Sequence, residues 1–311
     1  MEKGRKRDII FLNDKRSYNI RYRSDLMQKL TEAGFSIRSH GFFDSFFEAI
    51  TCLNFLVFNK RSFIISSNLK ANLICSVLRK SNCVVILNGL GRMRKVKLFR
   101  KFLILLYSNQ KKSNLIVQNY ADYRYLKLHS NMQNIFWIPG SGGTSRKHGV
   151  NREALIVQRD SKIRLVANSV KNIAKLLGSE TRINIIGCND FNLVNELFNS
   201  KQYKNIGYVD QESIFETGSI FIQPSGYGEG FPHTLSDAIL SNLQIIITKK
   251  DYVRFGMYRL GSRRREISKE WLEVENIKSV RNKVSESKIS SQIINIILEY
   301  TDNKWANKTC N

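Results

Sequence analysis

The 311-residue chain has no apolar run of the about eighteen residues that a transmembrane helix needs. Its longest candidates, such as Phe102 to Tyr107, are bounded by charged residues. Near the N-terminus, the apolar stretch Ile9 to Leu12 is too short for a secretory signal, and the polar residues Asn13 to Arg16 interrupt it. We therefore expect neither a membrane-spanning segment nor export.

The chain also lacks the spacing of a cysteine framework or a metal site. Its cysteines are odd in number, contain no C-x-x-C pair and stand mostly in apolar contexts: Cys52, Cys75, Cys83, Cys188 and Cys310. No two of the four histidines have the spacing of metal ligands. Buried, reduced thiols in a reducing compartment are the favoured interpretation, over a disulfide or a bound metal.

Acidic residues and prolines are scarce. Only three prolines accompany 42% hydrophobic and 11% aromatic residues, which is the composition of a folded protein. Fifty Lys and Arg against 26 Asp and Glu give a net charge of +24, so we expect an anionic partner. Nucleic acid is a remote alternative, because the charges are scattered through both halves and no aromatic-basic RNA-binding motif is present. A membrane surface or a phosphorylated substrate fits better.

The first half of the chain alternates short apolar runs with helical patterns, which predicts a parallel sheet with helices on both faces. The expected strands are Asp8 to Leu12, Phe35 to Ser39, Ser62 to Ser66, Cys83 to Leu87 and Asn114 to Val117. The expected helices are Ile20 to Ala33, Asn68 to Arg79 and Lys95 to Tyr107. This region is the first predicted domain, residues 1–143.

A polar, Gly-rich stretch from Ile138 to about Asn151 is the expected linker. The alternation then restarts, which predicts a second α/β domain over residues 152–311. Its expected elements are strand Ile163 to Ala167, helix Val170 to Leu177, strands Arg182 to Ile186, Tyr208–Val209 and Ser219 to Gln223, helix Pro232 to Ser241 and strand Gln244 to Thr248. A basic segment, Arg263 to Arg265, and a last amphipathic helix, Ile289 to Tyr300, follow. That last helix either stays with this domain or returns to the first.

The segment from Ile220 onward carries the strongest functional pattern. A strand ending at Gln223 leads into Gly226-Tyr227-Gly228-Glu229-Gly230-Phe231, and Pro232 then opens a helix. Glycines allow a close backbone approach, and the free N–H groups of a helix N-terminus attract anions. A carboxyl end of a strand in an open α/β sheet is also where ligands bind. The segment therefore predicts a phosphate site.

Two carboxylates accompany this predicted site. Glu229, between two glycines, contributes nothing to packing, so it is expected to accept hydrogen bonds from sugar hydroxyls. Asp237 lies on the helix, where it either contacts the ligand or only compensates the helix dipole. His233, in the first turn, either touches phosphate or is solvated.

The signature of family 4 glycosyltransferases resembles a set of residues in this segment: Pro224-Ser225, Glu229-Gly230-Phe231-Pro232, Leu235, Asp237-Ala238 and Ile245 to Thr248. In that family, two acidic residues bracket the sugar nucleotide. Asn88-Gly89-Leu90-Gly91 resembles the acceptor-side loop of a branch of the family that builds polysaccharides such as O-antigen on a lipid carrier. The end of that branch's N-terminal domain and its hinge resemble Ile116 to Asn119, Asp122, Tyr125-Leu126 and Ile138 to Gly142.

The resemblance implies an α/β fold of the GT-B kind, with two Rossmann-like domains whose parallel sheets face each other across a cleft. It assigns acceptor binding to residues 1–143 and sugar-nucleotide binding to residues 152–311. It implies a retaining, metal-independent glycosyltransferase without a cofactor, acting on a lipid-linked saccharide at the inner face of the membrane. Glu229 is the implied catalytic residue, and the implied donor-binding residues are Gly230, Phe231, Pro232, His233, Asp237 and Lys171. The implied acceptor-side loop is Gly89, Leu90 and Gly91.

The chain departs from the family pattern at several positions. Asp237 replaces the usual glutamate, and Lys171 alone stands for the usual Arg and Lys pair, with a solvated helix residue as its alternative interpretation. Residues 13–18 lack the usual glycine-rich loop, and Lys249 to Tyr252 replace a glycine-containing continuation. A catalytically degenerate homologue that acts as a partner subunit therefore stays open as an alternative.

A basic amphipathic segment from Arg92 to Lys101 interleaves cations with apolar residues, including Phe99 and, just beyond it, Phe102 and Leu103. This pattern is typical of a helix that lies on an anionic membrane surface. The alternative is that its apolar stripe packs into the N-terminal domain while the charges are solvated. We expect a cytoplasmic protein that binds the inner membrane peripherally.

Overall fold

The computed structural model describes residues 8–59, 62–78, 81–90, 96–108, 112–224 and 230–309. The chain divides into two compact units. Unit 1 contains the residues up to Gly142, a short piece that ends at Phe231, and the C-terminal part from Glu286. Unit 2 contains residues 143–227 and the residues from Pro232 to Ser285.

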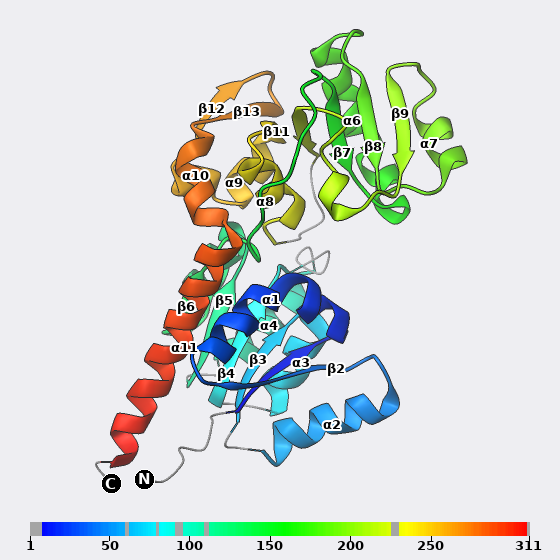
Figure 1. The fold of residues 1–311 in the computed structure, drawn as a ribbon. Coiled ribbons are helices and arrows are strands. Elements are labelled where there is room, and N and C mark those ends of the chain that lie inside the picture. The colour runs from blue at the N-terminus through cyan, green and yellow to red at the C-terminus, as the bar shows by residue number, and fades with distance from the viewer. Residues whose placement is uncertain are drawn as a thin grey trace. The chain divides into compact units, whose positions relative to one another are not determined.

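Unit 1 is built on a six-stranded parallel sheet with helices on both faces (Figure 1). In sheet order its strands are β2 (Ser36–Gly41), β1 (Asp8–Asn13), β3 (Phe63–Ser67), β4 (Ser81–Leu87), β5 (Lys112–Val117) and β6 (Ile135–Trp137). Its helices are α1 (Arg16–Glu32), α2 (Phe46–Val57), α3 (Leu69–Leu78), α4 (Lys97–Ser108), α5 (Tyr120–His129) and α11 (Glu286–Thr309). The strand order reverses between β1 and β3.

Alternate residues of each central strand in unit 1 enter two different cores. Ile10 and Leu12 of β1 pack with the helices α2, α3, α4 and α5, whereas Ile9 and Phe11 pack with α1 and α11. Both faces of the sheet are therefore covered, which explains why its strands are continuous apolar runs. The C-terminal helix α11 belongs to this unit, because Ile289, Ile293 and Ile297 are buried in the same core as α1.

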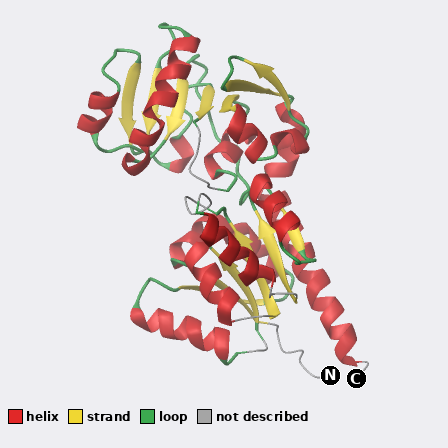
Figure 2. Ribbon diagram, turned by 180° about the vertical axis from the view of Figure 1, so that it is seen from behind, coloured by secondary structure: helices red, strands yellow, loops and turns green. Residues whose placement is uncertain are grey.

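Unit 2 contains a seven-stranded sheet, five strands of which are parallel (Figure 2). In sheet order the strands are β12 (Arg263–Glu266), β13 (Trp271–Glu275), β11 (Gln244–Thr248), β10 (Ile220–Gln223), β7 (Ala154–Val157), β8 (Ile183–Ile186) and β9 (Tyr203–Gly207). Its helices are α6 (Asp160–Leu177), α7 (Phe191–Leu197), α8 (His233–Leu240), α9 (Lys249–Arg254) and α10 (Ile277–Val284), with 3-10 turns η2 (Gln211–Ser213) and η3 (Met257–Leu260). Strands β13 and β12 add to the sheet in antiparallel fashion.

Two of the strands expected in unit 2 are wrong. Residues 163–167 are not a strand but the second turn of α6, because Ile163, Val166, Val170 and Ile173 bury one helical face. The first strand of the unit is instead β7. The expected strand Tyr208–Val209 lies after β9, and the basic segment Arg263 to Arg265 forms the edge strand β12, which pairs with β13.

Among the described helices, none is both long enough and apolar enough to cross a bilayer.

Candidate functional site

The strand order of unit 2 reverses between β7 and β10, and the carboxyl ends of these two strands form the candidate site. In open α/β sheets ligands bind at such a reversal. Helix α6 begins two residues after β7, with Arg159 as its N-cap, and α8 follows β10 with Pro232 as its N-cap. In the described part of the chain, no side chain caps either helix N-terminus. The two helices that follow these neighbouring strands thus both have N-termini without a side-chain cap, with the exposed cation of Arg159 just before α6 and the carboxylate of Asp160 in its first turn.

In the sequence, the predicted glycine-rich segment connects β10 to α8. Glu229 falls outside the described residues, as do residues 225–228. Gly230 is buried, and a Cβ at this position would collide with the main-chain oxygen of Asn88, so only glycine fits there. Phe231 is 3% exposed, and Pro232 precedes α8 by one residue, which makes it the N-cap and not the first helical residue.

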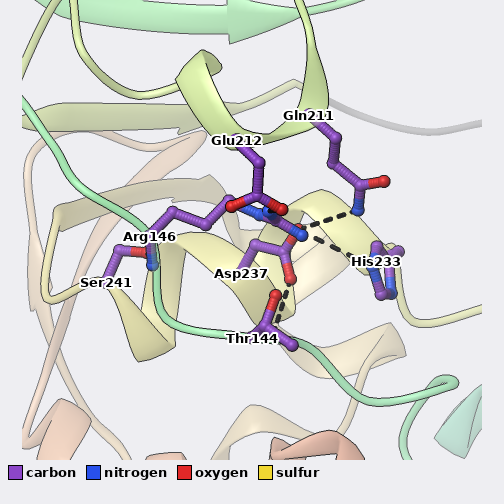
Figure 3. Close-up of polar contacts among 7 residues, drawn as sticks. All are labelled: Thr144, Arg146, Gln211, Glu212, His233, Asp237 and Ser241. Carbon is purple, nitrogen blue, oxygen red and sulfur yellow. Dashed lines mark hydrogen bonds and ion pairs between the residues drawn. The ribbon is translucent and has the colours of Figure 1, made fainter. Parts of the chain in front are cut away.

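Asp237 lies on α8 and is buried, with an exposed fraction of 1%. Figure 3 shows the groups that surround its carboxylate. The Thr144 N–H donates to Oδ1 at 2.8 Å, and the Arg146 Nε and Gln211 Nε2 donate to Oδ2 at 3.1 and 3.5 Å. Both oxygens therefore have protein partners. The carboxylate fixes the segment after Gly143 to α8, a role that the sequence did not predict.

Arg146 is the central cation of this cluster. Its side chain is 5% exposed, and it forms ion pairs with the buried Asp237 and, at 2.5 Å, with Glu212 of η2. Burial lowers the pKa of Arg146, but the hydrogen bonds and charges of Glu212 and Asp237 outweigh burial and raise it. The main-chain N–H of Arg146 also donates to the Ser241 hydroxyl at 2.8 Å. The guanidinium therefore stays charged and joins three segments of unit 2.

Gly143 shows how closely this segment approaches α8. A Cβ built at Gly143 would lie 2.7 Å from the main-chain nitrogen of Asp237 and 2.7 Å from its Oδ1. No other residue could occupy the position without moving the helix or the segment. The Gly-rich character of the linker thus has a packing reason, in addition to flexibility.

His233, in the first turn of α8, points toward the same carboxylate (Figure 3). Its Nε2 lies 3.6 Å from Asp237 Oδ2, at the i, i+4 spacing of one helical face. The side chain is 17% exposed, which disagrees with the interpretation of His233 as a solvated residue, whereas the alternative, a contact with phosphate, stays a prediction. His233 is the first residue of α8 and is placed to support the anchor at Asp237.

Lys171 does not follow the first strand of unit 2, as the sequence interpretation assumed. It lies in the interior of α6, exposed, with its ammonium 6.0 Å from the centre of the Phe198 ring. The cations that do follow β7 are Arg159 and Lys162, the latter in the first turn of α6. The sequence contains the signal that identifies them. Apolar residues from Ile163 to Ala174 recur at helical spacing, which leaves Ala154–Val157 as the preceding strand.

The predicted acceptor-side loop lies at the carboxyl end of β4 in unit 1. Leu90 is buried, and its N–H donates to the buried carboxylate of Asp122 at 3.1 Å. Gly89 precedes it, whereas Gly91 lies outside the described residues, as do Arg92 to Lys95 of the basic segment. Asp122 thus fixes the start of this loop to α5.

A polar cluster that the sequence did not predict surrounds the strand reversal of unit 1. Asn68 Nδ2 donates to Asn13 Oδ1 at 2.6 Å, and Asn88 Nδ2 donates to Asn68 Oδ1 at 2.5 Å. Asn13 is the last residue of β1, and Asn68 and Asn88 directly follow β3 and β4, so the three amides lie at the carboxyl ends of these strands. Asp14 lies beside them and accepts the Ala71 N–H at 2.9 Å. Burial raises the pKa of Asp14, although the Ala71 N–H and the Lys70 charge lower it. Such a carboxylate at a ligand-binding edge is a candidate functional group.

No protein-family model matches the sequence, and no curated protein matches it either. Solved structures do match the fold. HepE from Anabaena, solved in complex with UDP and glucose, is 13% identical with a TM-score of 0.58, over 95% of this chain and 98% of HepE. A Listeria monocytogenes protein provisionally assigned as a UDP-N-acetylglucosamine 2-epimerase is 9% identical with a TM-score of 0.55, over 93% and 95% of the two chains.

A chain of the GtfA/B complex is 15% identical with a TM-score of 0.51, and the match covers 77% of this chain but 57% of that one. At these identities the likeness establishes the fold. The chain has the α/β GT-B fold with two Rossmann-like domains that the sequence predicts.

Proposed function

We propose that the protein is a glycosyltransferase that uses a nucleotide-sugar donor bound at the carboxyl edge of β7 and β10. The observation that carries this proposal is that the two neighbouring strands at the reversal of unit 2, β7 and β10, are each followed by a helix, α6 and α8, whose N-terminus has no side-chain cap. Peptide dipoles and N–H groups at such ends favour a diphosphate. Arg159 and Lys162 supply the cations for which Lys171 was the candidate. UDP bound to HepE, a protein of the same fold, supports a nucleoside diphosphate as the ligand.

In the proposed reaction, the bond between the anomeric carbon and the diphosphate breaks, the oxygen of an acceptor hydroxyl forms a bond to that carbon, and the proton of the hydroxyl leaves with the nucleoside diphosphate. The negative charge that develops on the leaving diphosphate is stabilised by the preorganised N–H groups of Gly230, Phe231 and the first turn of α8, together with Arg159. Glu229 holds hydroxyls of the donor sugar and is the proposed catalytic residue. The proposal includes no metal and no cofactor, and it takes the configuration of the donor to be retained.

Asp237 has two proposed roles that can be separated by experiment. Its contacts with Thr144 and Arg146 make it the anchor of the linker on α8. The family resemblance implies a second role, a contact with the nucleotide ribose. For this contact, Oδ2 must accept a hydrogen bond from the ribose in addition to its bonds from Arg146 and Gln211, or in place of one of them. We propose the anchoring role as the main one, because both carboxylate oxygens already accept hydrogen bonds.

For the acceptor we propose a saccharide on a polyprenyl diphosphate, used in polysaccharide or O-antigen synthesis by a family 4 enzyme. The Gly89–Leu90 loop and the polar cluster of Asn13, Asp14 and Asn68 supply hydrogen-bonding groups at the carboxyl edge of unit 1, and a saccharide needs such groups. The basic segment Arg92 to Lys101 supports a peripheral position on the cytoplasmic face of the membrane, where such acceptors are found.

The test is a turnover assay with a panel of sugar nucleotides and a synthetic lipid-linked disaccharide. Release of nucleoside diphosphate together with an acceptor that gains one sugar mass supports the proposal. Interconversion of the free sugar nucleotide without transfer would instead identify an epimerase, which the fold also permits. Binding of donor without any turnover would identify the catalytically degenerate partner subunit. The Glu229→Gln variant is the control for release by a contaminant.

A further inference from the structure

Helix α2 presents large apolar side chains on its outer surface. Phe46, Phe47 and Phe58 are 75%, 79% and 78% exposed. The outward residues Phe46, Ile50, Leu53 and Val57 follow the i, i+4, i+7, i+11 spacing of one helical face. A different face, with Cys52 and Leu56, is buried in the core of unit 1. The helix is therefore packed, and its outer apolar face is an additional feature of the fold.

Helix α4 repeats this arrangement. Its inward side chains Leu103 and Tyr107 are buried, and these are core residues. A second stripe, Leu98, Phe102 and Leu105, is exposed at the i, i+4, i+7 spacing. One stripe therefore packs into the domain, as the alternative interpretation expects, and another faces outward beside the exposed Lys97 and Lys101, whereas binding of this helix to a membrane stays a prediction.

These two helices belong to one layer. Helix α3 contacts both α2 and α4, and the buried sides of all three helices pack on the same face of the sheet. Helix α3 adds Val77 and Leu78 to the exposed apolar residues. We call the exposed apolar side chains of α2, α3 and α4, with Phe58, the outer layer face. Large exposed apolar side chains on three successive helices of one layer are typical of a binding surface for another molecule.

The charge pattern around the outer layer face identifies the kind of partner. Residues 42–111 contain twelve Lys or Arg against two acidic residues, Asp44 and Glu48. Glu48, the one acidic residue within α2, pairs with His40 at 2.9 Å. Among the described residues of the layer, Lys70, Lys97 and Lys101 are exposed cations. An apolar surface with a positive border is complementary to a bilayer that contains anionic lipids.

We infer that the outer layer face inserts into an anionic lipid bilayer, with α2 as the element whose aromatic side chains enter the acyl region. The inference rests on the proposed function only where it explains why the protein binds the membrane: binding brings the enzyme to a lipid-linked acceptor. Helix α2 lies in the plane of the interface, because its apolar stripe runs along its whole length. The cations of α4 bind headgroups, and the phenylalanines of α2 provide the apolar burial.

The test compares the Phe46→Ser, Phe47→Ser double variant with the wild type in flotation on phosphatidylglycerol vesicles. Ser45 caps α2 by accepting the Glu48 N–H, and the variant keeps this cap. Each phenylalanine that leaves the bilayer should weaken binding about tenfold, so the double variant should bind about a hundredfold more weakly. The matched control is Leu165→Ser, at a 57% exposed apolar residue of α6 in unit 2, which should float like the wild type.

Flotation of the double variant equal to that of the wild type would overturn the inference. So would wild-type binding to phosphatidylcholine vesicles as strong as to phosphatidylglycerol vesicles. Sedimentation without lipid distinguishes a second copy of the chain as the occupant: a wild-type dimer that the double variant abolishes, with vesicle binding unchanged, would also contradict it. An unchanged melting temperature and unchanged donor binding of the variant separate this outcome from failure of the fold or of the proposed reaction.

Discussion

Replacement of Asp237 by alanine should destabilise unit 2, because it removes the partner of a buried cation. The Arg146 and Asp237 side chains are 5% and 1% exposed and are joined at 3.1 Å. Loss of one partner from a buried ion pair costs about 3–5 kcal/mol. Arg146 keeps Glu212, so the lower value of about 3 kcal/mol applies. At about 2–4 °C per kcal/mol, the melting temperature should fall by about 6–12 °C.

Differential scanning calorimetry of three variants measures this effect. Glu212→Ala is the matched control, because Glu212 is 84% exposed and its pair with Arg146 should contribute less than about 1 kcal/mol. The double variant Arg146→Met, Asp237→Ala should be more stable than the sum of the single effects predicts, since neither charge is then left alone. A melting temperature of Asp237→Ala within about 1 °C of the wild type would refute the anchoring role. A loss of nucleoside diphosphate affinity of about tenfold without destabilisation would instead favour the ribose contact.

Three further outcomes are expected. Glu229→Ala should abolish sugar transfer in the turnover assay with a melting temperature near that of the wild type; turnover at the wild-type rate would remove Glu229 from the reaction. Asp14→Asn should keep the contact with the Ala71 N–H and raise the melting temperature slightly at about pH 7, because burial raises the pKa of Asp14 and so disfavours its ionised form in the folded state. This gain should disappear below about pH 3.9, the pKa of an aspartate in the unfolded chain. A loss of stability of the variant at neutral pH would contradict this reasoning. Burial, and to a lesser extent nearby carboxylates, raises the pKa of Cys52 and of Cys188 to about 12, so Ellman's reagent at about pH 8 should react with neither thiol before the protein unfolds. The contribution of the two protonated thiols to stability should be lost as the pH rises from about 9 toward 12. Rapid labelling of either residue in the native protein would show that its thiol is accessible.

The sequence predicted the fold class because both sheets consist of apolar strands between helices. Strands β1, β3, β4 and β5 were expected within one or two residues of their observed bounds. The error in unit 2 arose because Ile163 to Ala167 is a short apolar run, and such a run fits either a strand or one turn of an amphipathic helix. Helical spacing that continues to Ala174 decides the question, as the burial of that face shows.

The candidate site was predicted in part. The glycine segment and the start of α8 follow from local sequence, because glycine and proline restrict the backbone directly. The cluster around Asp237 could not be predicted, because Arg146 and Asp237 are 91 positions apart and only the folded unit brings them together. Asp14 was missed for the same reason, since its partner Ala71 belongs to another strand-helix unit. The shift from Lys171 to Arg159 followed from the misplaced strand.

The most direct test of the central claim is a thermal-shift titration of the wild-type protein with a panel of sugar nucleotides, alongside an Arg159→Gln variant. A ligand that binds only the folded state stabilises it by about 2.7 kcal/mol at a hundred times its dissociation constant. We predict that at least one sugar nucleotide and its nucleoside diphosphate raise the melting temperature of the wild type, and that Arg159→Gln needs about tenfold more of either for the same shift. A wild-type melting temperature that no sugar nucleotide or nucleoside diphosphate changes would contradict the proposal that the β7 and β10 edge binds a nucleotide-sugar donor.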